Sequence, residues 1–87
     1  MPYIKPEKRL ELDKIVEQIS MHLKQLQATE WNGGLNYLIT KALKNLYKPS
    51  YFNYERIMGL LACMQHEFYR RWISTYEDLK KSEHGDI

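Results

Sequence analysis

The chain has little cysteine, glycine or proline. Among 87 residues there are one Cys, four Gly and three Pro. A single cysteine excludes an intrachain disulfide framework and a zinc ribbon, and so few Gly and Pro disfavour a loop-rich fold. No apolar run approaches the roughly 18 residues of a membrane span, and the N-terminus lacks the apolar stretch of a signal peptide. These absences predict one soluble domain over 1–87, located in the cytoplasm.

The small net charge of +2 is unevenly distributed along the chain. Residues 31–48 contain Lys41, Lys44 and Lys48 but no acidic residue. A locally basic segment attracts phosphates and other anions, although this one is less basic than the footprint of a duplex-DNA binder. The alternative interpretation is a solvated face that keeps the protein soluble.

Apolar residues recur at steps of three and four in three segments, with no alternation of period two. The spacing predicts helices over 6–27, about 34–47 and 51–73. Pro6 suits the first position of the first helix, and the alternative is that Asp13 caps a fresh start and leaves a separate short turn at 6–11. We expect the glycine pair at 33–34 to end the linker between the first two helices in a tight turn. The helix N-terminus that follows would offer free amides to an anion, a weak signal, near Asn36, Tyr37, Thr40 and Lys41.

Capping signals mark the later helix starts. Ser50 or Asn53 is expected to cap the third helix. The sequence Ser74-Thr75-Tyr76-Glu77 fits a capping box, which predicts a short fourth helix at 75–82.

Short connections between these helices favour an all-α fold. We expect a small antiparallel bundle of three main helices plus a short C-terminal helix, with an extended arm at 1–5 and a flexible tail at 83–87. Such a bundle has a thin core, and the chain has more large apolar side chains than the bundle would cover. Self-association to a homo-oligomer is therefore expected.

No pattern in the chain indicates catalysis or metal binding. The pair His66-Glu67 resembles the start of a zinc-protease motif, but Arg70 occupies the place of the second histidine. Cys63 and His66 share a helix face, yet Cys63 lies in an apolar run and is expected to be a small buried thiol. We therefore predict no enzyme activity, no cofactor and no metal.

The segment 67–72 is the richest in groups that recognise phosphate and bases. Glu67 and Arg71 are four apart and are expected to pair, which leaves Arg70 without that partner. Arginine forks bind phosphate and flat aromatic rings stack on bases. The predicted ligand-binding residues are Arg70, Arg71, Tyr69, Tyr76, Lys41 and Lys44. The alternative is that the aromatic rings pack the helix ends while the arginines lie in solvent.

Several short motifs resemble those of one small family. They are Met-Pro-Tyr-Ile-Lys-Pro-Glu at the start, Gly-Gly-Leu-Asn-Tyr-Leu-Ile-Thr at 33–40, Gly-Leu-Leu-Ala-Cys at 59–63, Glu-Phe-Tyr-Arg-Arg at 67–71, Tyr-Glu-Asp-Leu-Lys at 76–80 and Gly-Asp-Ile at the end. The chain resembles an uncharacterised family of short helical proteins carried by bacteria and their phages. It departs from that family at His84, where Asn is usual, and at Thr75, where Pro is frequent.

The resemblance implies a phage context but no activity. By analogy with small oligomeric phage proteins, it suggests a sponge that sequesters a nucleotide-derived immune signal in a basic and aromatic pocket. The expected partners are thus a small anionic ligand and further copies of the chain, without membrane or duplex DNA. One alternative is a protein-interaction module that blocks or scaffolds a partner through Tyr51, Phe52 and Trp72. The other is weak binding of single-stranded nucleic acid.

Overall fold

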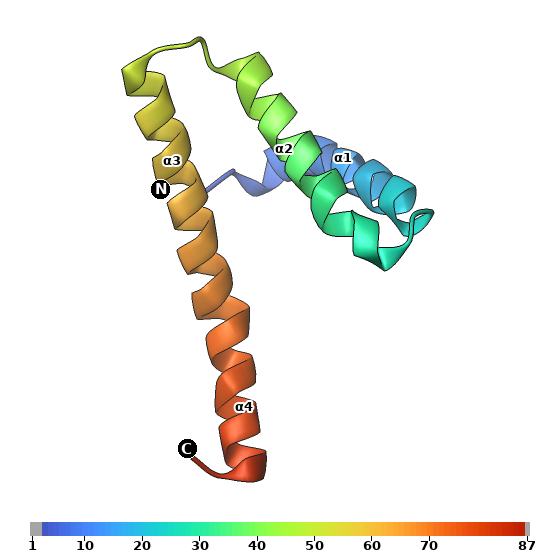
Figure 1. The fold of residues 1–87 in the computed structure, drawn as a ribbon, viewed down its shortest axis with the longest axis vertical. Coiled ribbons are helices and arrows are strands. Elements are labelled where there is room, and N and C mark those ends of the chain that lie inside the picture. The colour runs from blue at the N-terminus through green and yellow to red at the C-terminus, as the bar shows by residue number, and fades with distance from the viewer. Residues whose placement is uncertain (1–2, 87) are drawn as a thin grey trace. The chain divides into compact units, whose positions relative to one another are not determined.

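The computed structural model describes residues 3–86, and every regular element in that range is helical. The four α-helices are α1 (Pro6–Lys24), α2 (Trp31–Leu46), α3 (Tyr51–Phe68) and α4 (Ser74–His84) (Figure 1). A short 3₁₀ turn, η1 (Ala28–Glu30), precedes α2, and a π-helical turn, η2 (Tyr69–Ile73), joins α3 to α4. The all-α class with three main helices and a C-terminal helical extension is confirmed. The chain divides into two units, residues 1–46 and 47–87, and each is described by itself.

Helix α1 starts where the sequence predicts and ends three residues early. Pro6 occupies the start of the helix after Lys5, whose backbone is extended (ψ 145°). The arm is therefore non-helical over residues 3–5, and its first two positions lie outside the described residues. The guanidinium Nε of Arg9 donates to the carbonyl oxygen of Ile4 at 2.9 Å, which ties the arm to the first turn of α1.

The glycine pair does not form the predicted turn. Gly33 and Gly34 lie inside α2, which begins at Trp31 rather than near residue 34, and neither has a positive φ. A Cβ added at Gly34 would stand 2.7 Å from Cδ2 of Leu23, so the missing side chain lets α1 approach closely. Trp31 strengthens this contact because its Nε1 donates to the carbonyl oxygen of Leu23 at 2.7 Å. The glycine at 34 thus serves packing between the two helices of this unit.

Helix α3 has the serine cap that the sequence predicts. The Oγ of Ser50 accepts a hydrogen bond from the backbone N–H of Asn53 at 3.0 Å. Asn53 is not itself the cap, and its Nδ2 donates to the carbonyl oxygen of Lys48 at 2.9 Å. Together these bonds fix the start of the third helix.

The predicted capping box at 74–77 is wrong, because the chain stays helical from residue 51 to residue 84. Ile73 has helical angles (φ −70°, ψ −48°), and α4 has no side-chain cap. A helix that continues supplies acceptors for its own amides, so none needs the Ser74 oxygen. The neighbouring hydroxyl of Thr75 instead donates to the carbonyl oxygen of Arg71 at 3.2 Å.

The described tail is also shorter than predicted. Helix α4 reaches His84, so only residues 85 and 86 of the expected 83–87 tail are described as non-helical, and Ile87 lies outside the described residues. Gly85 has φ +85°, and its N–H donates to the carbonyl oxygen of Lys81 at 2.8 Å. Glycine adopts this left-handed region without strain, which makes it a favourable helix stop.

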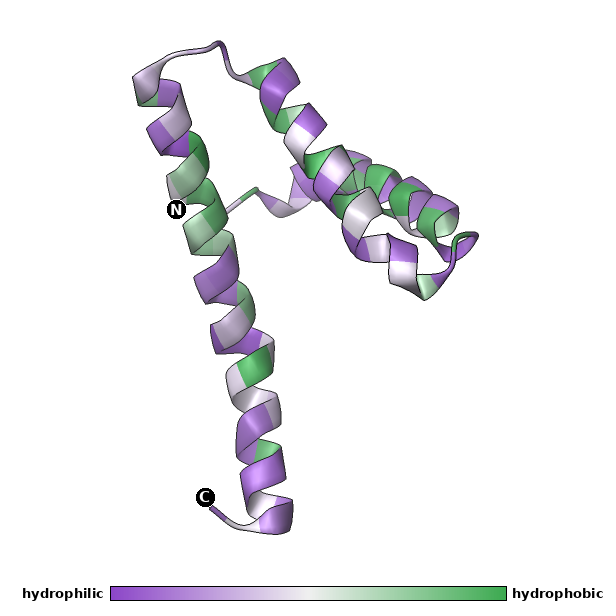
Figure 2. Ribbon diagram, in the orientation of Figure 1, coloured by the Kyte–Doolittle hydropathy of each residue, from purple (hydrophilic) through white to green (hydrophobic). Residues whose placement is uncertain are grey.

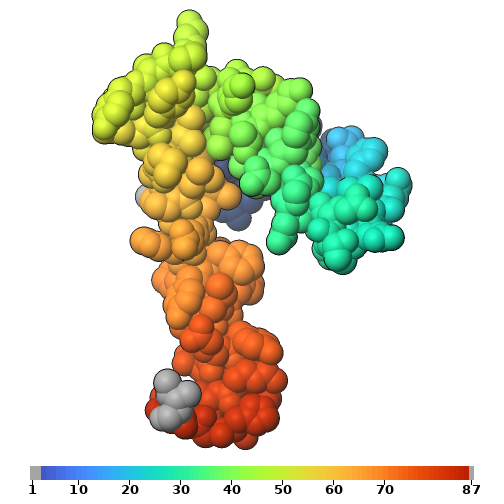
Figure 3. Space-filling model, viewed as in Figure 1, coloured from blue at the N-terminus to red at the C-terminus, as the bar shows by residue number. Residues whose placement is uncertain are grey.

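None of the described side chains is buried. In the first unit, hydrophobic and hydrophilic residues are interspersed along both helices (Figure 2). In the second unit, α3, η2 and α4 follow one another as a single helical column, coloured yellow to red in Figure 3. Large apolar rings on this column stay half-exposed, with Phe68 at 57% and Trp72 at 53%. None of the helices among residues 3–86 is long and apolar enough to cross a membrane.

The prediction that Cys63 is a buried thiol is wrong. Its side chain is exposed, and the main neighbour of α3 within the second unit is η2, which continues the same helical column. An apolar neighbourhood in sequence buries a side chain only when a second surface packs against it.

We expect Cys63 to react with a thiol reagent in the native protein at a rate close to that of the unfolded chain. The reason is that access to an exposed thiol is not limited by unfolding. Labelling followed by mass spectrometry, with and without denaturant, measures the ratio of the two rates. A native rate slower by roughly a hundredfold or more would show instead that this face is covered in solution.

Candidate functional site

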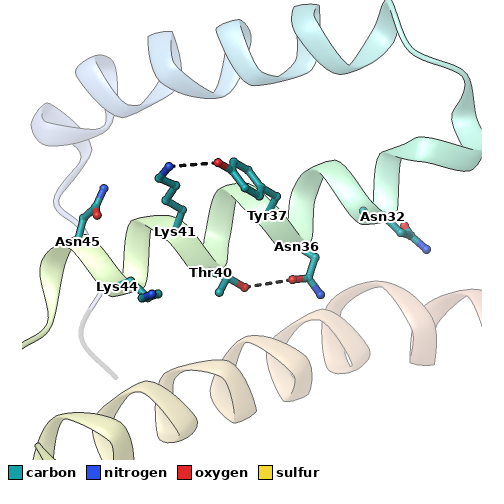
Figure 4. A pocket seen from close by; sticks show the side chains of 8 residues that line it. Asn32, Asn36, Tyr37, Thr40, Lys41, Lys44 and Asn45 are labelled. Carbon is teal, nitrogen blue, oxygen red and sulfur yellow. Dashed lines mark hydrogen bonds between the residues drawn. The ribbon is translucent and has the colours of Figure 1, made fainter. Parts of the chain in front are cut away.

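One face of α2 gathers polar side chains around an open depression of about 680 Å³ (Figure 4). Its lining residues all belong to this helix and are Asn32, Gly33, Asn36, Tyr37, Thr40, Lys41, Lys44 and Asn45. They recur at steps of three and four, so they share a face. Because every lining residue lies on one helix, the depression is open rather than enclosed.

Two hydrogen-bonded pairs order this face. The hydroxyl of Thr40 donates to Oδ1 of Asn36 at 3.1 Å, and Nζ of Lys41 donates to the hydroxyl of Tyr37 at 3.1 Å. The ammonium of Lys41 also lies 5.4 Å from the centre of the Tyr37 ring, within the range of a cation–π contact. Figure 4 shows the Tyr37–Lys41 pair along one edge of this face and the Asn36–Thr40 pair along the other, with Lys44 one turn beyond Thr40.

The electrostatic character of the α2 face is positive. Lys41 and Lys44 both line the depression, and α2 contains no acidic residue. The asparagine and threonine side chains add donors and acceptors suited to a base or a sugar. This face can therefore attract an anion and hydrogen-bond a polar group attached to it.

The arginines of the second unit are already engaged with a carboxylate. Nη2 of Arg70 lies 3.0 Å from both Oε1 and Oε2 of Glu67, and Nη1 of Arg71 lies 3.6 Å from Oε1. The prediction that Arg70 lacks this partner is wrong, because residues three apart on a helix are neighbours as much as residues four apart. The shared carboxylate offsets part of the positive charge that a phosphate would meet.

The two rings predicted to bind a ligand, Tyr69 and Tyr76, contact charged groups other than the arginines. The hydroxyl of Tyr69 donates to Oε1 of Glu77 at 3.4 Å, and the ring of Tyr76 lies 5.4 Å from Nζ of Lys80. The guanidinium of Arg71 lies 5.0 Å from the ring of Trp72. Each ring thus has a different charged neighbour.

The structure brings together some of the predicted site residues but not all. Lys41 and Lys44 share the α2 depression, and Arg70 and Arg71 share one glutamate. The two pairs belong to different units, 1–46 and 47–87. Whether any of these residues binds a ligand stays a prediction.

The sequence reasoning missed Asn32 and Asn45 as members of the α2 face. The signal that could have found the first is a ladder of polar residues at steps of four, from Asn32 through Asn36 and Thr40 to Lys44. The prediction that the glycine pair opens the helix with free amides is wrong, because the helix begins before it. The side chains of α2, rather than its N-terminus, make this face polar.

The fold and the α2 face define a small helical chain that offers an exposed polar and basic surface. Among residues 3–86, no group of three or more His, Cys, Asp or Glu side chains is placed to hold a metal ion. The chain belongs to the family described as a domain of unknown function, DUF6899, whose model matches residues 1–87. No curated protein and no solved structure matches the chain.

Proposed function

We propose that this protein binds a small anionic ligand of nucleotide type on the polar face of α2 and acts without catalysing a reaction. The observation that carries the proposal is the depression of about 680 Å³ with two lysines and no acidic residue on its helix. Lys41 and Lys44 would attract the phosphate, and the amides of Asn36 and Asn45 would hydrogen-bond the base or sugar. In a phage context such binding would sequester a nucleotide-derived immune signal.

This proposal shifts the main binding residues from the arginines to the lysines. A phosphate approaching Arg70 and Arg71 must compete with Glu67, which stands 3.0 Å from the first and 3.6 Å from the second. The lysines face no such competitor on their own helix. We therefore expect the arginines and the rings of Tyr69 and Tyr76 to contribute less than the α2 face.

The first test is whether a nucleotide co-purifies. Ultraviolet absorbance at nucleotide wavelengths, beyond what two Trp and seven Tyr explain, would reveal it, and mass spectrometry of the denatured supernatant would identify it. Calorimetric titration with ATP and with ADP-ribose then gives affinities for two defined probes.

We expect the double replacement Lys41→Gln with Lys44→Gln to weaken the affinity for whichever of the two probes binds by roughly tenfold to a hundredfold. A hydrogen bond from a charged donor contributes about 1.5–3 kcal/mol, and 1.4 kcal/mol corresponds to a factor of ten. Exposure and salt reduce this figure, so raising the salt concentration should weaken binding to the native protein as well.

The matched control is the double replacement Arg70→Gln with Arg71→Gln, which removes the same charge from the other unit. This variant should bind within about threefold of the native protein. A larger loss in the arginine variant than in the lysine variant would return the site to residues 69–76. If neither probe binds and no nucleotide co-purifies, the proposal is wrong.

A second candidate function is a protein-interaction module. The observation that favours it is the exposure of large aromatic side chains on the second unit, with Tyr51 at 79%, Phe52 at 69% and Trp72 at 53%. Aromatic residues are enriched at the centres of protein interfaces. In this function the chain would block or scaffold a partner protein.

A further inference from the structure

The column formed by α3, η2 and α4 carries an apolar stripe that no element of its own unit covers. The stripe follows steps of three and four residues, and we call it the α3–α4 stripe. Its members are Ile57, Leu60, Met64, Phe68, Trp72, Tyr76 and Leu79. None of them is buried, and the main contacts between elements of this unit are those of η2 with α3 and with α4, along the same column. An amphipathic helix gains stability mainly from a surface packed on its apolar side, so this stripe requires one.

The π-helical turn keeps the stripe straight. The steps from Met64 to Phe68, to Trp72 and to Tyr76 are each four residues long. In an α-helix a step of four overshoots one turn by about 40°, so three steps would rotate Tyr76 by about 120° away from Met64. A π-helical turn holds one residue more than an α turn and removes about 100° of that rotation. η2 lies within these steps, and Phe68 and Trp72 contact one another with ring centres 4.9 Å apart.

The spacing of the stripe is symmetric about Phe68. Three members precede Phe68 by four, eight and eleven residues, and three follow it by the same numbers. The matched pairs, from the centre outward, are Met64 with Trp72, Leu60 with Tyr76, and Ile57 with Leu79. With equal residue spacing on the two sides of Phe68, each member of one copy can meet its matched member in a second copy that runs antiparallel about a two-fold axis.

The chemistry of the matched pairs agrees with this symmetry. The half before Phe68 is aliphatic, whereas the half after it contains Trp72 and Tyr76. Antiparallel pairing would set aliphatic side chains against rings, including the Met64 thioether against an indole, and thioethers make favourable contacts with rings. Pairing in the same direction would instead set each ring against its own copy.

The charges beside the centre are complementary as well. Glu67 and Arg71 flank Phe68, and within one chain Nη1 of Arg71 lies 3.6 Å from Oε1 of Glu67. An antiparallel pair centred on Phe68 places position 67 of each copy opposite position 69 of the other, so each Glu67 comes within about half a helical turn of Arg71 in the second copy. Two reciprocal ion pairs would then surround the axis.

We propose that a second copy of this chain covers the α3–α4 stripe, antiparallel, with the two-fold axis at Phe68. The available area agrees with this partner. Each of the seven members exposes roughly 100 Å² of side chain, so each copy offers about 700 Å². This is close to the ~800 Å² that each partner buries in an interface of standard size. This inference uses no residue of the α2 face, so it stands independently of the proposed ligand.

Disulfide trapping tests the direction and the register of the pair. Two single-cysteine proteins are made in the Cys63→Ser background, one with Met64→Cys and one with Trp72→Cys. The antiparallel pair places position 64 of one copy opposite position 72 of the other. Under mild oxidation at micromolar concentration, the mixture should therefore form a covalent dimer with one chain of each kind, at several times the yield of either protein alone.

Two other outcomes overturn the proposal. If each single-cysteine protein cross-links to itself as well as the mixture cross-links, the stripes run parallel. If no sample cross-links and light scattering of the unmodified chain gives a mass near 10.5 kDa, the stripe is covered by the chain's own first unit or by another protein. The light-scattering measurement needs no substitution, so the proposal remains testable even if a cysteine variant fails to fold. Equal helical circular dichroism in all samples is the folding control.

Discussion

The replacement Gly34→Val should lower the free energy of unfolding of the first unit by about 1 kcal/mol. A Cβ at this position would stand 2.7 Å from Cδ2 of Leu23, far inside van der Waals contact. Leu23 could turn its methyl away from an alanine, but valine adds two more methyl groups in the same gap. The carbonyl oxygen of Leu23 also accepts the Trp31 indole bond at 2.7 Å, so moving the two helices apart would lengthen that bond.

Thermal unfolding followed by circular dichroism measures the effect. For a domain of this size, 1 kcal/mol shifts the unfolding midpoint by roughly 4–8 °C. All samples are compared at one protein concentration, because self-association makes the midpoint depend on concentration.

The adjacent glycine provides a matched control. Gly33 lies in the same helix, and a Cβ added there meets nothing within 4 Å. Gly33→Val should therefore raise the free energy of unfolding by a few tenths of a kcal/mol, since valine is a better helix former than glycine. Equal midpoints for the two variants would contradict the close approach of α1 and α2 at Gly34.

Much of the helical architecture was predictable from the apolar spacing. The steps of three and four over 6–27 and 51–73 correspond to α1 and to α3 with η2, because one-sided burial of a helix leaves this period in the sequence. The Ser50 cap was predictable too, since a serine oxygen bonds an amide three residues later in the chain.

The errors concern residues whose local preference can be satisfied in two ways. Glycine permits both a turn and a close helix contact, and at Gly34 the structure uses the contact. Serine caps a helix only where the preceding residue leaves the helix, and Ile73 does not. The residues of the π-helical turn do not by themselves predict it. One extra residue in a turn is detected only by comparing the apolar positions before the turn with those after it.

The sequence predicts the positive charge of the candidate site but not which of the predicted residues lie together. Lys41 and Lys44 stand out in a segment without acids, and both line the α2 depression. The predicted pairing of Glu67 with Arg71 alone was wrong because the sequence places Glu67 within reach of both arginines. In the structure Glu67 lies closer to Arg70 than to Arg71. Burial of Cys63 could not be predicted because it depends on what packs against α3, which the apolar run does not specify.

The length of η2 should control self-association, if the α3–α4 stripe pairs as proposed. Inserting one Ala between Ile73 and Ser74 should rotate everything beyond it by about 100°, because the added residue extends a helix that is already one residue over-long at this turn. Tyr76 and Leu79 would then leave the stripe. Each large apolar side chain contributes about 1.5–3 kcal/mol when fully buried, so the association constant should fall by roughly a hundredfold or more.

Deletion of Ile73 is the matched control for that insertion, because it changes the length by the same amount in the other direction. Removing one residue lets the π-helical turn close as an α turn, and Tyr76 and Leu79 keep facing the same way as Phe68. Light scattering at one fixed micromolar concentration should therefore report a dimer for the native chain and the deletion, and a mass near 10.5 kDa for the insertion. Helical circular dichroism should stay close to native in both variants, since neither change breaks the helix. If the deletion dissociates the pair and the insertion does not, the π-helical turn does not align the stripe, and the register centred on Phe68 is wrong.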